Sequence, residues 1–390
     1  AAMGSLRAVQ DGLFELDQDI NTILASWRLD GEGLTERRRV TPRTLMSHVS
    51  GLGDAFGFPG YDPSGPFPTL VQILEGEPPS NTRPLFMERE PWEAFEYSGG
   101  GVTLQQLALA DARGRPFAEI LWADVLGPIG MTRSSFAQPM PALREENAAA
   151  AHDAEGNRKG EPRWHVYPEQ AAAGLWTTPT DLARFMIEVQ RSVRGESNRV
   201  LDVGHAREMI TPVGVGDFGV GFALSKEGEG WYFQHGGANW GFRANVIAQT
   251  VKGYGVTIMT NADRGSAAIN EVEERVARVY GWDSQRAPVP RGYLPRPDRI
   301  DLPVSELRKF VGNYERPEDF DITIELFEGA LRMVADGQPI IPLEPVGDGI
   351  FMTLQVNWEV VFELTDDGEV TGFRLRTNGG NERRWVRGSG

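Results

Sequence analysis

The spacing of apolar residues changes along the chain from a helical period to a strand period. In the opening AAMGSLRAVQDG the apolar residues share one helical face, and Gly12 suits the left-handed position that follows a helix end. From Gly219 the runs GVGFAL, WYFQH, RANVIAQ and GVTIMT are short, β-rich and separated by glycine turns. This pattern predicts a helical region followed by an antiparallel sheet.

The helices predicted before and after this sheet are short and mostly amphipathic. A Thr-Pro-Thr-Asp start favours Thr180 or Asp181 as the cap of one of them. Residues 138–168 are polar, rich in alanine and aperiodic, and they predict a long surface loop. The predicted helices span residues 42–47, 69–74, 104–112, 117–125, 181–193 and 267–280.

The end of the chain has a different character. Residues 284–303 contain five prolines and are predicted to form a linker. Beyond them, runs such as DITIEL alternate apolar and polar residues, and Asp-Gly or Asn-Gly pairs at 336, 348, 367 and 378 are hairpin signals. They predict an antiparallel barrel of about eight strands. The chain is therefore expected to be mixed α/β (α+β), with a domain at 1–283, a linker at 284–303 and a barrel at 304–390.

Composition excludes several classes of partner. The 390 residues carry a net charge of −16, which argues against binding to nucleic acid or to an anionic membrane. No apolar run approaches the roughly 18 residues of a membrane helix, so no membrane span is predicted. We expect a soluble protein that acts on small molecules, and the bacterial cytoplasm, the periplasm and the exterior all stay open as its location.

The residue types present also limit the chemistry. The chain has no cysteine, which excludes disulfides and thiolate nucleophiles. Its five histidines show neither HxH nor HExxH spacing, so we expect no metal. No GxGxxG or GxxxxGK[ST] loop implies an organic cofactor, and the lack of GxSxG counts against the α/β-hydrolase fold.

The stretch FEYSGGG, residues 95–101, is a candidate for chemistry. Glycines permit positive φ and close approach of another backbone, so Tyr97 is predicted to lie at a glycine turn. There it could serve for packing or for proton transfer. A proton-transfer group needs a nucleophile, but the pattern Ser-x-x-Lys occurs nowhere in the chain.

Six stretches in a fixed order resemble one known family: LRAVQDGLFELDQDIN, TPRTLMSHVSGL, FEYSGGGVTLQQLAL, PFAEILWADVLGPIGMTRSSF, AAAGLWTTPTDLARF and HGGANWGFRANVIAQTVKGYGVTIMTNAD. Most of residues 1–283 resembles the serine β-lactamase and penicillin-binding-protein superfamily, in its class C branch of esterases and D-aminopeptidases. From about Leu307 the chain resembles the lipocalin-like barrel attached to some of these hydrolases. The resemblance implies a β-lactamase/transpeptidase-like domain, in which helices flank an antiparallel sheet beside a helical region.

The family's site needs three motifs, of which two can be placed on this sequence. The resemblance assigns Tyr97 to the tyrosine motif and His235-Gly236-Gly237 to the motif on an edge strand of the sheet. The third motif, Ser-x-x-Lys at the start of a helix, is expected shortly before Ala1. Residues omitted from the sequence, a separate N-terminal fragment that carries the motif, and a homologue without the nucleophile are the three explanations that stay open.

By this resemblance the site works through an acyl-enzyme, with Tyr97 and His235 as its catalytic residues. A serine hydroxyl is a weak nucleophile and needs an adjacent base, a role that the lysine and Tyr97 would share. Gly236 and Gly237 would let the substrate approach the strand. The backbone N–H of Ala238 would help to form the oxyanion hole.

The remaining candidates concern substrate binding and packing. Ser98 is expected to line the pocket as a turn residue, and Trp240 and His165 are expected to touch the substrate. His48, in SHVSG, is expected to be structural. Gly99 stands where the family has asparagine, which removes the side-chain amide that grips an acylamino group.

The leading prediction is a serine hydrolase, of esterase or D-amino-acid peptidase type, acting on a small ester, amide or short peptide. Gly99 speaks against an efficient β-lactamase, and so does His235, because a histidine replaces the permanent cation that binds a β-lactam carboxylate. Two alternatives stay open: a catalytically silent binding protein of the penicillin-binding-protein type, and a weak β-lactamase.

Overall fold

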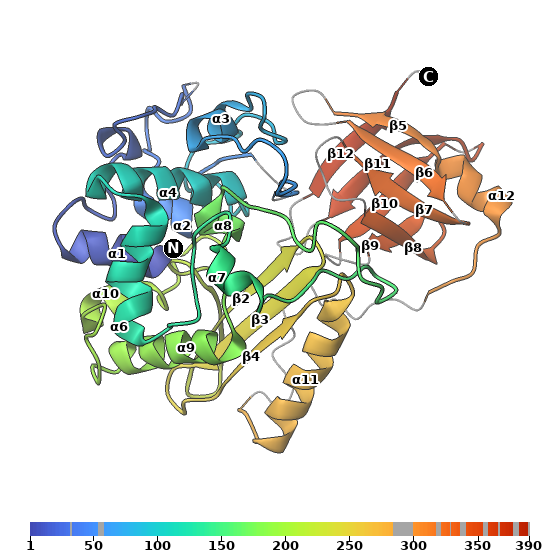
Figure 1. Ribbon diagram of the computed structural model, residues 1–390. Helices are drawn as coiled ribbons and strands as arrows, with labels where there is room; N and C mark the ends of the chain where they lie inside the picture. The colour runs from blue at the N-terminus through green and yellow to red at the C-terminus, as the bar shows by residue number, and fades with distance from the viewer. Residues whose placement is uncertain are drawn as a thin grey trace. The chain divides into compact units, whose positions relative to one another are not determined.

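The computed structural model describes residues 1–31, 33–53, 58–283, 299–316, 321–327, 329–335, 341–353, 358–365, 367–376 and 382–388. The chain separates into two compact units, Ala1–Pro288 and Val289–Gly390 (Figure 1). Most of the predicted linker, residues 284–298, lies outside the described residues. The hairpin signals at Asp336-Gly337 and Asn378-Gly379 also lie outside them.

Short helices dominate the first part of the first unit, as the helical period predicts. Gly12 has φ +76° just past the first helix, which is the left-handed conformation predicted there. The helices are α1 (Ala2–Gln10), α2 (Pro42–Met46), α3 (Leu70–Glu75), α4 (Gly99–Arg113), α5 (Phe117–Leu121), α6 (Gly127–Ile129), α7 (Ala142–Glu145), α8 (Gln170–Ala173), α9 (Pro179–Val193), α10 (Val203–Glu208) and α11 (Gly265–Val279). No pattern had predicted α7, α8 or α10.

The start of α4 corrects the prediction of a glycine turn after Tyr97. Ser98 caps the helix, and its Oγ accepts a hydrogen bond from the N–H of Gly101 at 2.8 Å. The three glycines therefore form the first helical turn instead of a loop. A Cβ on Gly101 would lie 3.4 Å from side-chain atoms of Leu45 and Leu52, so glycine lets α4 pack closely on this part of the core.

Two other helix boundaries differ from the predictions. The cap of α9 is Thr178, whose Oγ1 accepts a hydrogen bond from the N–H of Asp181, so neither Thr180 nor Asp181 is the cap. The helix predicted to end before Gly127 continues through a π-helical turn, Trp122–Leu126, into α6. The proline in α6 therefore lies near the end of one continuous helical stretch and does not stop it where the sequence predicted.

Four antiparallel strands form the sheet of the first unit, as predicted. They are β1 (Ala223–Glu227), β2 (Gly230–Asn239), β3 (Phe242–Gln249) and β4 (Gly255–Thr260), in the order β1-β2-β3-β4. The first strand begins later than the run GVGFAL predicted. Gly221 has φ +93°, far from the values of a regular strand, and β1 begins after it.

Helices cover both faces of this sheet. Successive strand residues point to opposite faces, so Phe233 and Val246 join the main core of the unit, together with residues of α9. Tyr232 and Ile247 point the other way and pack with Trp282 and residues of α11. Figure 1 shows α9 and α11 on opposite sides of the strands.

The segment 138–168, predicted as a surface loop, is partly buried in the first unit. Trp164, Val166 and Tyr167 are buried, and the backbone of Val166 pairs with that of Tyr61 through two hydrogen bonds of 2.8 Å. The Tyr167 hydroxyl accepts a hydrogen bond from the N–H of Trp240, just after β2. The aperiodic sequence gave no sign that this segment supports the end of a strand.

The second unit contains a closed antiparallel barrel of eight strands, as the alternating pattern and the hairpin signals predicted. Successive strands pair, and β12 closes the ring on β5. Gly349 and Gly368 have positive φ at two of the predicted hairpins. The short helix α12 (Val304–Leu307) precedes the barrel strands β5 (Gly312–Glu315), β6 (Ile322–Phe327), β7 (Ala330–Val334), β8 (Ile341–Gly347), β9 (Ile350–Thr353), β10 (Glu359–Leu364), β11 (Val370–Arg376) and β12 (Glu382–Arg387).

Aromatic rings pack inside the barrel. Phe362 contacts Tyr314, Phe351 and Phe373 edge to face, with centroids 5.5 to 5.9 Å apart. Trp385 stacks on Phe373 at 5.3 Å. All five side chains are buried, so inward positions of different strands meet in one core.

Candidate active site

A cavity of about 830 Å³ lies in the first unit. The amino end of α1, the end of β2 and the segment around α8 all contribute to its lining. Its size is that of a small-molecule site, and elements far apart in the sequence meet there. The predicted site residues in its lining are His235, Gly236, Gly237, Ala238, Trp240 and His165.

The end of β2 presents exposed backbone to this cavity. Gly236, Gly237 and Ala238 are exposed although they pair with β3. A Cβ on Gly236 would meet no atom closer than 3.7 Å, and one on Gly237 none closer than 3.9 Å. The packing of the described residues therefore does not require glycine here, whereas an incoming ligand would benefit from the space that glycine leaves.

His235 lies on β2 at the start of this exposed stretch. Its Nδ1 lies 2.7 Å from the carbonyl oxygen of Gly236, which fixes the ring when Nδ1 carries the proton. Desolvation by its surroundings lowers the pKa of His235 below the ordinary value of 6.5. The imidazole is therefore neutral at pH 7, and it does not supply a permanent cation.

Tyr97 reaches the same region from the chain segment before α4. Its side chain is 45% exposed, and its ring lies 6.3 Å from that of His235, centroid to centroid. It also stacks on His48, which lines the cavity, with the two centroids 4.1 Å apart. The structure thus brings the two predicted catalytic residues together, although 138 positions separate them in the sequence.

His48, whose ring stacks on that of Tyr97, adopts an unusual backbone conformation. Its φ of 58° lies in the left-handed region, and its side chain is buried. Nδ1 accepts a hydrogen bond from the N–H of Ser98 at 3.2 Å. Burial lowers the pKa of His48 to about 3, so this ring is neutral and can keep accepting that bond. Such strained residues cluster at functional sites.

Ser98 and Gly99 lie behind Tyr97 instead of beside the substrate space. Both are buried at the start of α4, and the Ser98 side chain caps that helix. In this position they fix the backbone from which the side chain of Tyr97 projects. Their direct contact with substrate, expected from the sequence, stays a prediction.

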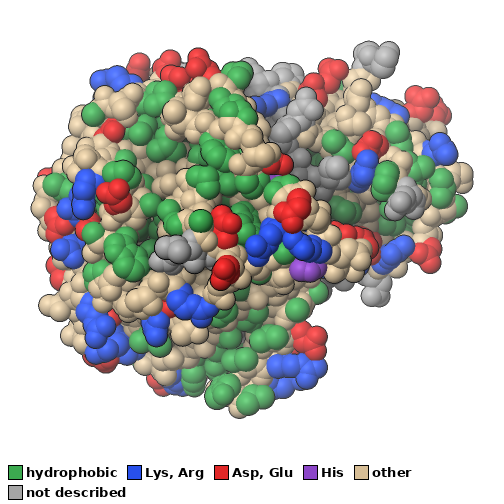
Figure 2. Space-filling view, in the orientation of Figure 1, with side chains coloured by type: hydrophobic (Ala, Val, Ile, Leu, Met, Phe, Trp, Pro, Cys, Tyr) green, Lys and Arg blue, Asp and Glu red, His purple; other side chains and the backbone are tan. Residues whose placement is uncertain are grey.

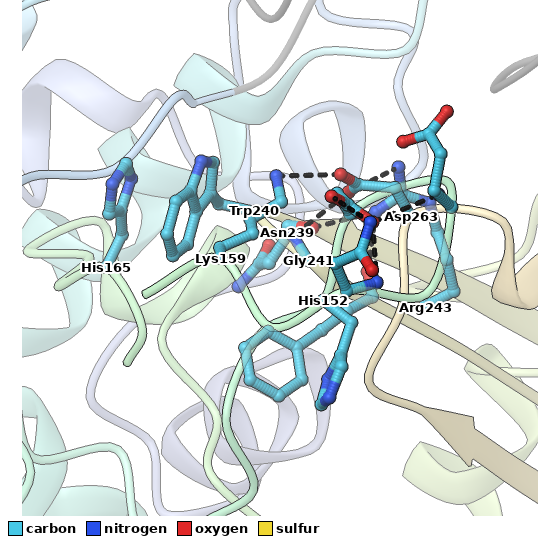
Figure 3. Close-up of polar contacts among 12 residues, drawn as sticks. His152, Lys159, His165, Asn239, Trp240, Gly241, Arg243 and Asp263 are labelled. Carbon is cyan, nitrogen blue, oxygen red and sulfur yellow. Dashed lines mark hydrogen bonds and ion pairs between the residues drawn. The ribbon is translucent and has the colours of Figure 1, made fainter. Parts of the chain in front are cut away.

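Trp240 and His165 form one wall of the cavity. Their rings are parallel to within 5° and their centroids lie 4.2 Å apart (Figure 3). His165 Nδ1 lies 2.9 Å from the carbonyl oxygen of Pro59, and burial lowers the pKa of His165. The ammonium group of Lys159 lies 4.4 Å from the centre of the Trp240 ring. The wall is therefore a flat aromatic surface held from several sides.

Behind this wall lies a group of charges that we call the Asp263 cluster: Lys159, Arg243 and Asp263. Lys159 Nζ lies 2.7 Å from one carboxylate oxygen of Asp263, and Arg243 Nη2 lies 3.4 Å from the other (Figure 3). The N–H of Gly241 donates to the same carboxylate at 3.0 Å. Arg243 Nη1 donates to the carbonyl oxygen of Asn239 at 2.7 Å, so the cluster holds the turn between β2 and β3.

Sequence reasoning missed the Asp263 cluster. Its members lie in three separate segments, and no local spacing connects them. The one available signal was Lys159, because lysine is rare in this chain and this one falls in a segment without periodicity. That signal did not indicate a partner.

The described part of the chain shows neither a metal site nor a membrane-spanning helix. No cluster of three or more His, Asp or Glu side chains there is arranged to hold a metal ion. None of the helices in these residues is long and apolar enough to span a bilayer. On the face shown in Figure 2, acidic and basic side chains are interspersed, and no large basic patch is visible.

Comparison with known families gives two matches. The Beta-lactamase family model matches residues 1–299, and a domain of unknown function (DUF3471) matches residues 296–386. A comparison with curated proteins gave no match.

Solved structures with the same fold include three kinds of protein. SurE, crystallised with D-Leu, has 18% identity and a TM-score of 0.58, covering 99% of this chain and 84% of that one. An octameric penicillin-binding protein homologue from Pyrococcus abyssi has 17% identity and a TM-score of 0.53, covering 99% and 85%. A D-amino acid amidase from Ochrobactrum anthropi SV3, complexed with L-phenylalanine amide, has 22% identity and a TM-score of 0.51, covering 72% and 81%.

At these identities the structures establish a shared fold and nothing about substrate. The family model is more specific, because it spans about three quarters of the sequence and includes Tyr97, His235 and the whole lining of the cavity. The chain belongs to the beta-lactamase family.

Proposed function

We propose that this chain is part of a serine hydrolase that forms an acyl-enzyme on a small ester, amide or short peptide. One observation carries the proposal: His235 and the exposed backbone of residues 236–238 line a cavity that the amino end of α1 also borders, and the ring of Tyr97 lies 6.3 Å from that of His235. The 390 residues contain no Ser-x-x-Lys, so the proposal needs this motif from outside them.

The proposed reaction assigns a role to each group. The serine Oγ attacks the substrate carbonyl carbon, and its proton passes to the lysine and Tyr97. The oxyanion that forms accepts hydrogen bonds from the N–H of Ala238 and from that of the serine. When the bond to the alcohol or amine breaks, Tyr97 returns a proton to the leaving group. Water then hydrolyses the acyl-enzyme and releases the acid and the free serine.

The family supports this reaction type without choosing the substrate. The fold shared with the D-amino acid amidase makes a D-amino-acid amide one candidate, and simple esters are another. A β-lactam is a weaker candidate, because His235 is neutral at pH 7 and Gly99 offers no amide side chain. Turnover of penicillin-type substrates should therefore be slow beside that of esters.

The first test is the intact mass, under denaturing conditions, of the protein from its natural source. A mass well above 43.1 kDa, or a second polypeptide, would supply the residues for Ser-x-x-Lys. That protein should then be labelled covalently by serine-directed probes, such as a fluorophosphonate, which phosphonylates the serine Oγ and releases fluoride. A protein that carries Ser-x-x-Lys and ignores every such probe would overturn the proposal.

A silent binding protein is the second candidate, and the missing Ser-x-x-Lys in these 390 residues favours it. A single natural species of 43.1 kDa should then bind D-amino-acid peptides or cell-wall fragments saturably, without forming product. Ester turnover that Tyr97→Phe abolishes would exclude this candidate.

A further inference from the structure

The polar groups that face the cavity are mostly uncharged. Its lining consists of apolar and aromatic side chains, amides, hydroxyls and imidazoles, and among the described residues in it none is Asp or Glu. Two arginines also line the cavity. Arg133 is exposed, whereas Arg243 is buried and only 7% exposed.

Of the buried ionisable groups next to the cavity, Lys159, Arg243 and Asp263 are paired with one another, and burial raises the pKa of the remaining carboxyl, Glu169, to about 7, so that it is mostly uncharged at pH 6. Asp263 receives three donors, from Lys159, Arg243 and the N–H of Gly241. The Asp263 cluster has two positive charges and one negative charge, and its net charge is therefore +1. A ligand cation near this wall would meet a carboxylate that is already neutralised, and a net positive charge beside it.

The pKa values of three histidines near the cavity indicate how strongly these surroundings disfavour a positive charge. Burial lowers the pKa of His48 to about 3, and it lowers the pKa values of His165 and His235 as well. The surroundings of the cavity thus disfavour the protonated form of three groups at three places. The same desolvation would act on any unpaired ammonium group brought in by a ligand.

Aromatic rings form much of the lining of the cavity. The stacked pair of Trp240 and His165 presents a flat face on one wall. Trp176 contacts Trp164 and Phe242 edge to face, with centroids 5.5 and 5.9 Å apart, and all three line the cavity. Rings so arranged suit stacked or edge-to-face contact with a further ring.

We propose that the cavity takes an uncharged acyl group with an aromatic side chain and rejects the free α-ammonium group of an amino-acid amide. The inference rests on the hydrolase function proposed above, and it narrows the substrate class. Esters and amides of arylalkanoic acids fit it, as do those of N-acylated aromatic amino acids. The free amides of amino acids do not.

Binding to the 390-residue chain tests this without any turnover. The ligands are 3-phenylpropanamide and D-phenylalanine amide, which differ in the α-ammonium group, with L-phenylalanine amide as the third. Tryptophan fluorescence follows each titration at pH 6 and at pH 9.5. At pH 6 the uncharged amide should bind about tenfold more tightly or better. The difference should shrink at pH 9.5, because an α-amino group has a pKa of about 8 and is then uncharged.

Two pairs of variants locate the effect. Trp240→Phe should reduce the fluorescence response, whereas Trp27→Phe, outside the cavity lining, should leave it unchanged. Lys159→Met removes one cation of the Asp263 cluster and should reduce the preference for the uncharged ligand about threefold or more. Lys226→Met is its matched control, because Lys226 also lies over a tryptophan ring, that of Trp231, but outside the cavity lining.

The outcomes separate this inference from the proposed function. Equal or tighter binding of either phenylalanine amide at pH 6 would overturn the inference, and so would the failure of all three ligands to bind. An unchanged preference in Lys159→Met would also contradict it. Failure of the hydrolase proposal would appear elsewhere, as a protein with Ser-x-x-Lys that no serine-directed probe labels although the binding preference is present.

Discussion

The imidazole of His48 lies stacked on the phenol ring of Tyr97, with centroids 4.1 Å apart and ring planes 29° apart. The same imidazole accepts a hydrogen bond from the N–H of Ser98, the residue after Tyr97. One buried side chain therefore fixes both the ring of Tyr97 and the backbone from which it projects. Although Tyr97 is exposed, these two contacts give its ring a defined orientation toward His235.

Tyr97→Phe tests the proton-transfer role. In a chain that carries Ser-x-x-Lys, the variant should lose about 100-fold or more in the rate of acylation, because a general acid–base group contributes a factor of that order. Stability should change little, since the ring and its stacking on His48 stay. Stopped-flow acylation by a chromogenic ester measures the effect. Tyr280→Phe, at an exposed position after α11, is the matched control, and equal rates for the two variants would contradict the role.

His48→Ala should destabilise the first unit more than His48→Asn. Alanine is strained at φ 58° and leaves the N–H of Ser98 without its acceptor, which together cost about 2–4 kcal/mol. Asparagine tolerates the left-handed region and should cost at least about 1 kcal/mol less. Urea denaturation gives the unfolding free energies. If His48→Ala is as stable as the wild type, the residue does not support Tyr97 in this way.

The parts of this structure that the sequence predicted are those with a clear local signal. The change of period near Gly219 indicated the sheet, and the alternation in DITIEL indicated a barrel strand, in which Ile322 and Ile324 are buried. Both signals arise because neighbouring positions on one face share an environment. Pairing Tyr97 with His235 needed the family resemblance, because no local rule connects residues so far apart.

Where the prediction failed, distant contacts had determined the local structure. The glycines after Tyr97 resemble a turn, yet packing against Leu45 and Leu52 favours glycine in the first turn of α4. Residues 138–168 have no period, because their burial depends on single contacts such as that of Tyr167 with Trp240. A close packing partner that lies elsewhere in the chain leaves no trace in a short window of sequence.

Gly237→Ala should impair acylation without unfolding the protein. A Cβ at this position would contact no atom closer than 3.9 Å, so the unfolding free energy should stay within about 0.5 kcal/mol of the wild type. The methyl group would occupy space beside Ala238, the proposed oxyanion donor, and acylation of a chain with Ser-x-x-Lys should slow about tenfold or more. Gly204→Ala in α10 is the control outside the cavity. An unaffected rate in Gly237→Ala would show that substrate does not approach this strand.

Asp263→Asn should destabilise the turn between β2 and β3. The variant leaves the buried guanidinium of Arg243 without its carboxylate, and the loss of a partner from a buried ion pair costs about 3 kcal/mol. Hydrogen exchange should therefore become faster in peptides that cover residues 236–241. Glu271→Gln breaks an exposed ion pair with Arg275 and should cost less than about 1 kcal/mol. Equal effects of the two variants would contradict a supporting role for the Asp263 cluster.

Glu169→Gln tests how a buried carboxyl beside the cavity links stability to pH. Glu169 is fully buried just before α8, and burial raises its pKa from 4.5 to about 7. Between these two values the folded protein binds a proton that the unfolded chain has lost, so the contribution of Glu169 to stability falls as the pH rises. Glutamine carries no titratable proton and removes this dependence.

The stability of Glu169→Gln relative to the wild type should therefore increase between pH 5 and pH 8. A pKa raised to about 7 corresponds to an increase of at most roughly 3 kcal/mol, at about 1.4 kcal/mol for each pKa unit. Urea denaturation at both pH values measures it, with hydrogen exchange of peptides from residues 160–180 to assign the transition to the first unit. Glu155→Gln, at an exposed position, is the control for the effect of the substitution itself. A difference for Glu169→Gln that does not change with pH would mean that this carboxyl ionises as readily in the folded protein as in the unfolded chain.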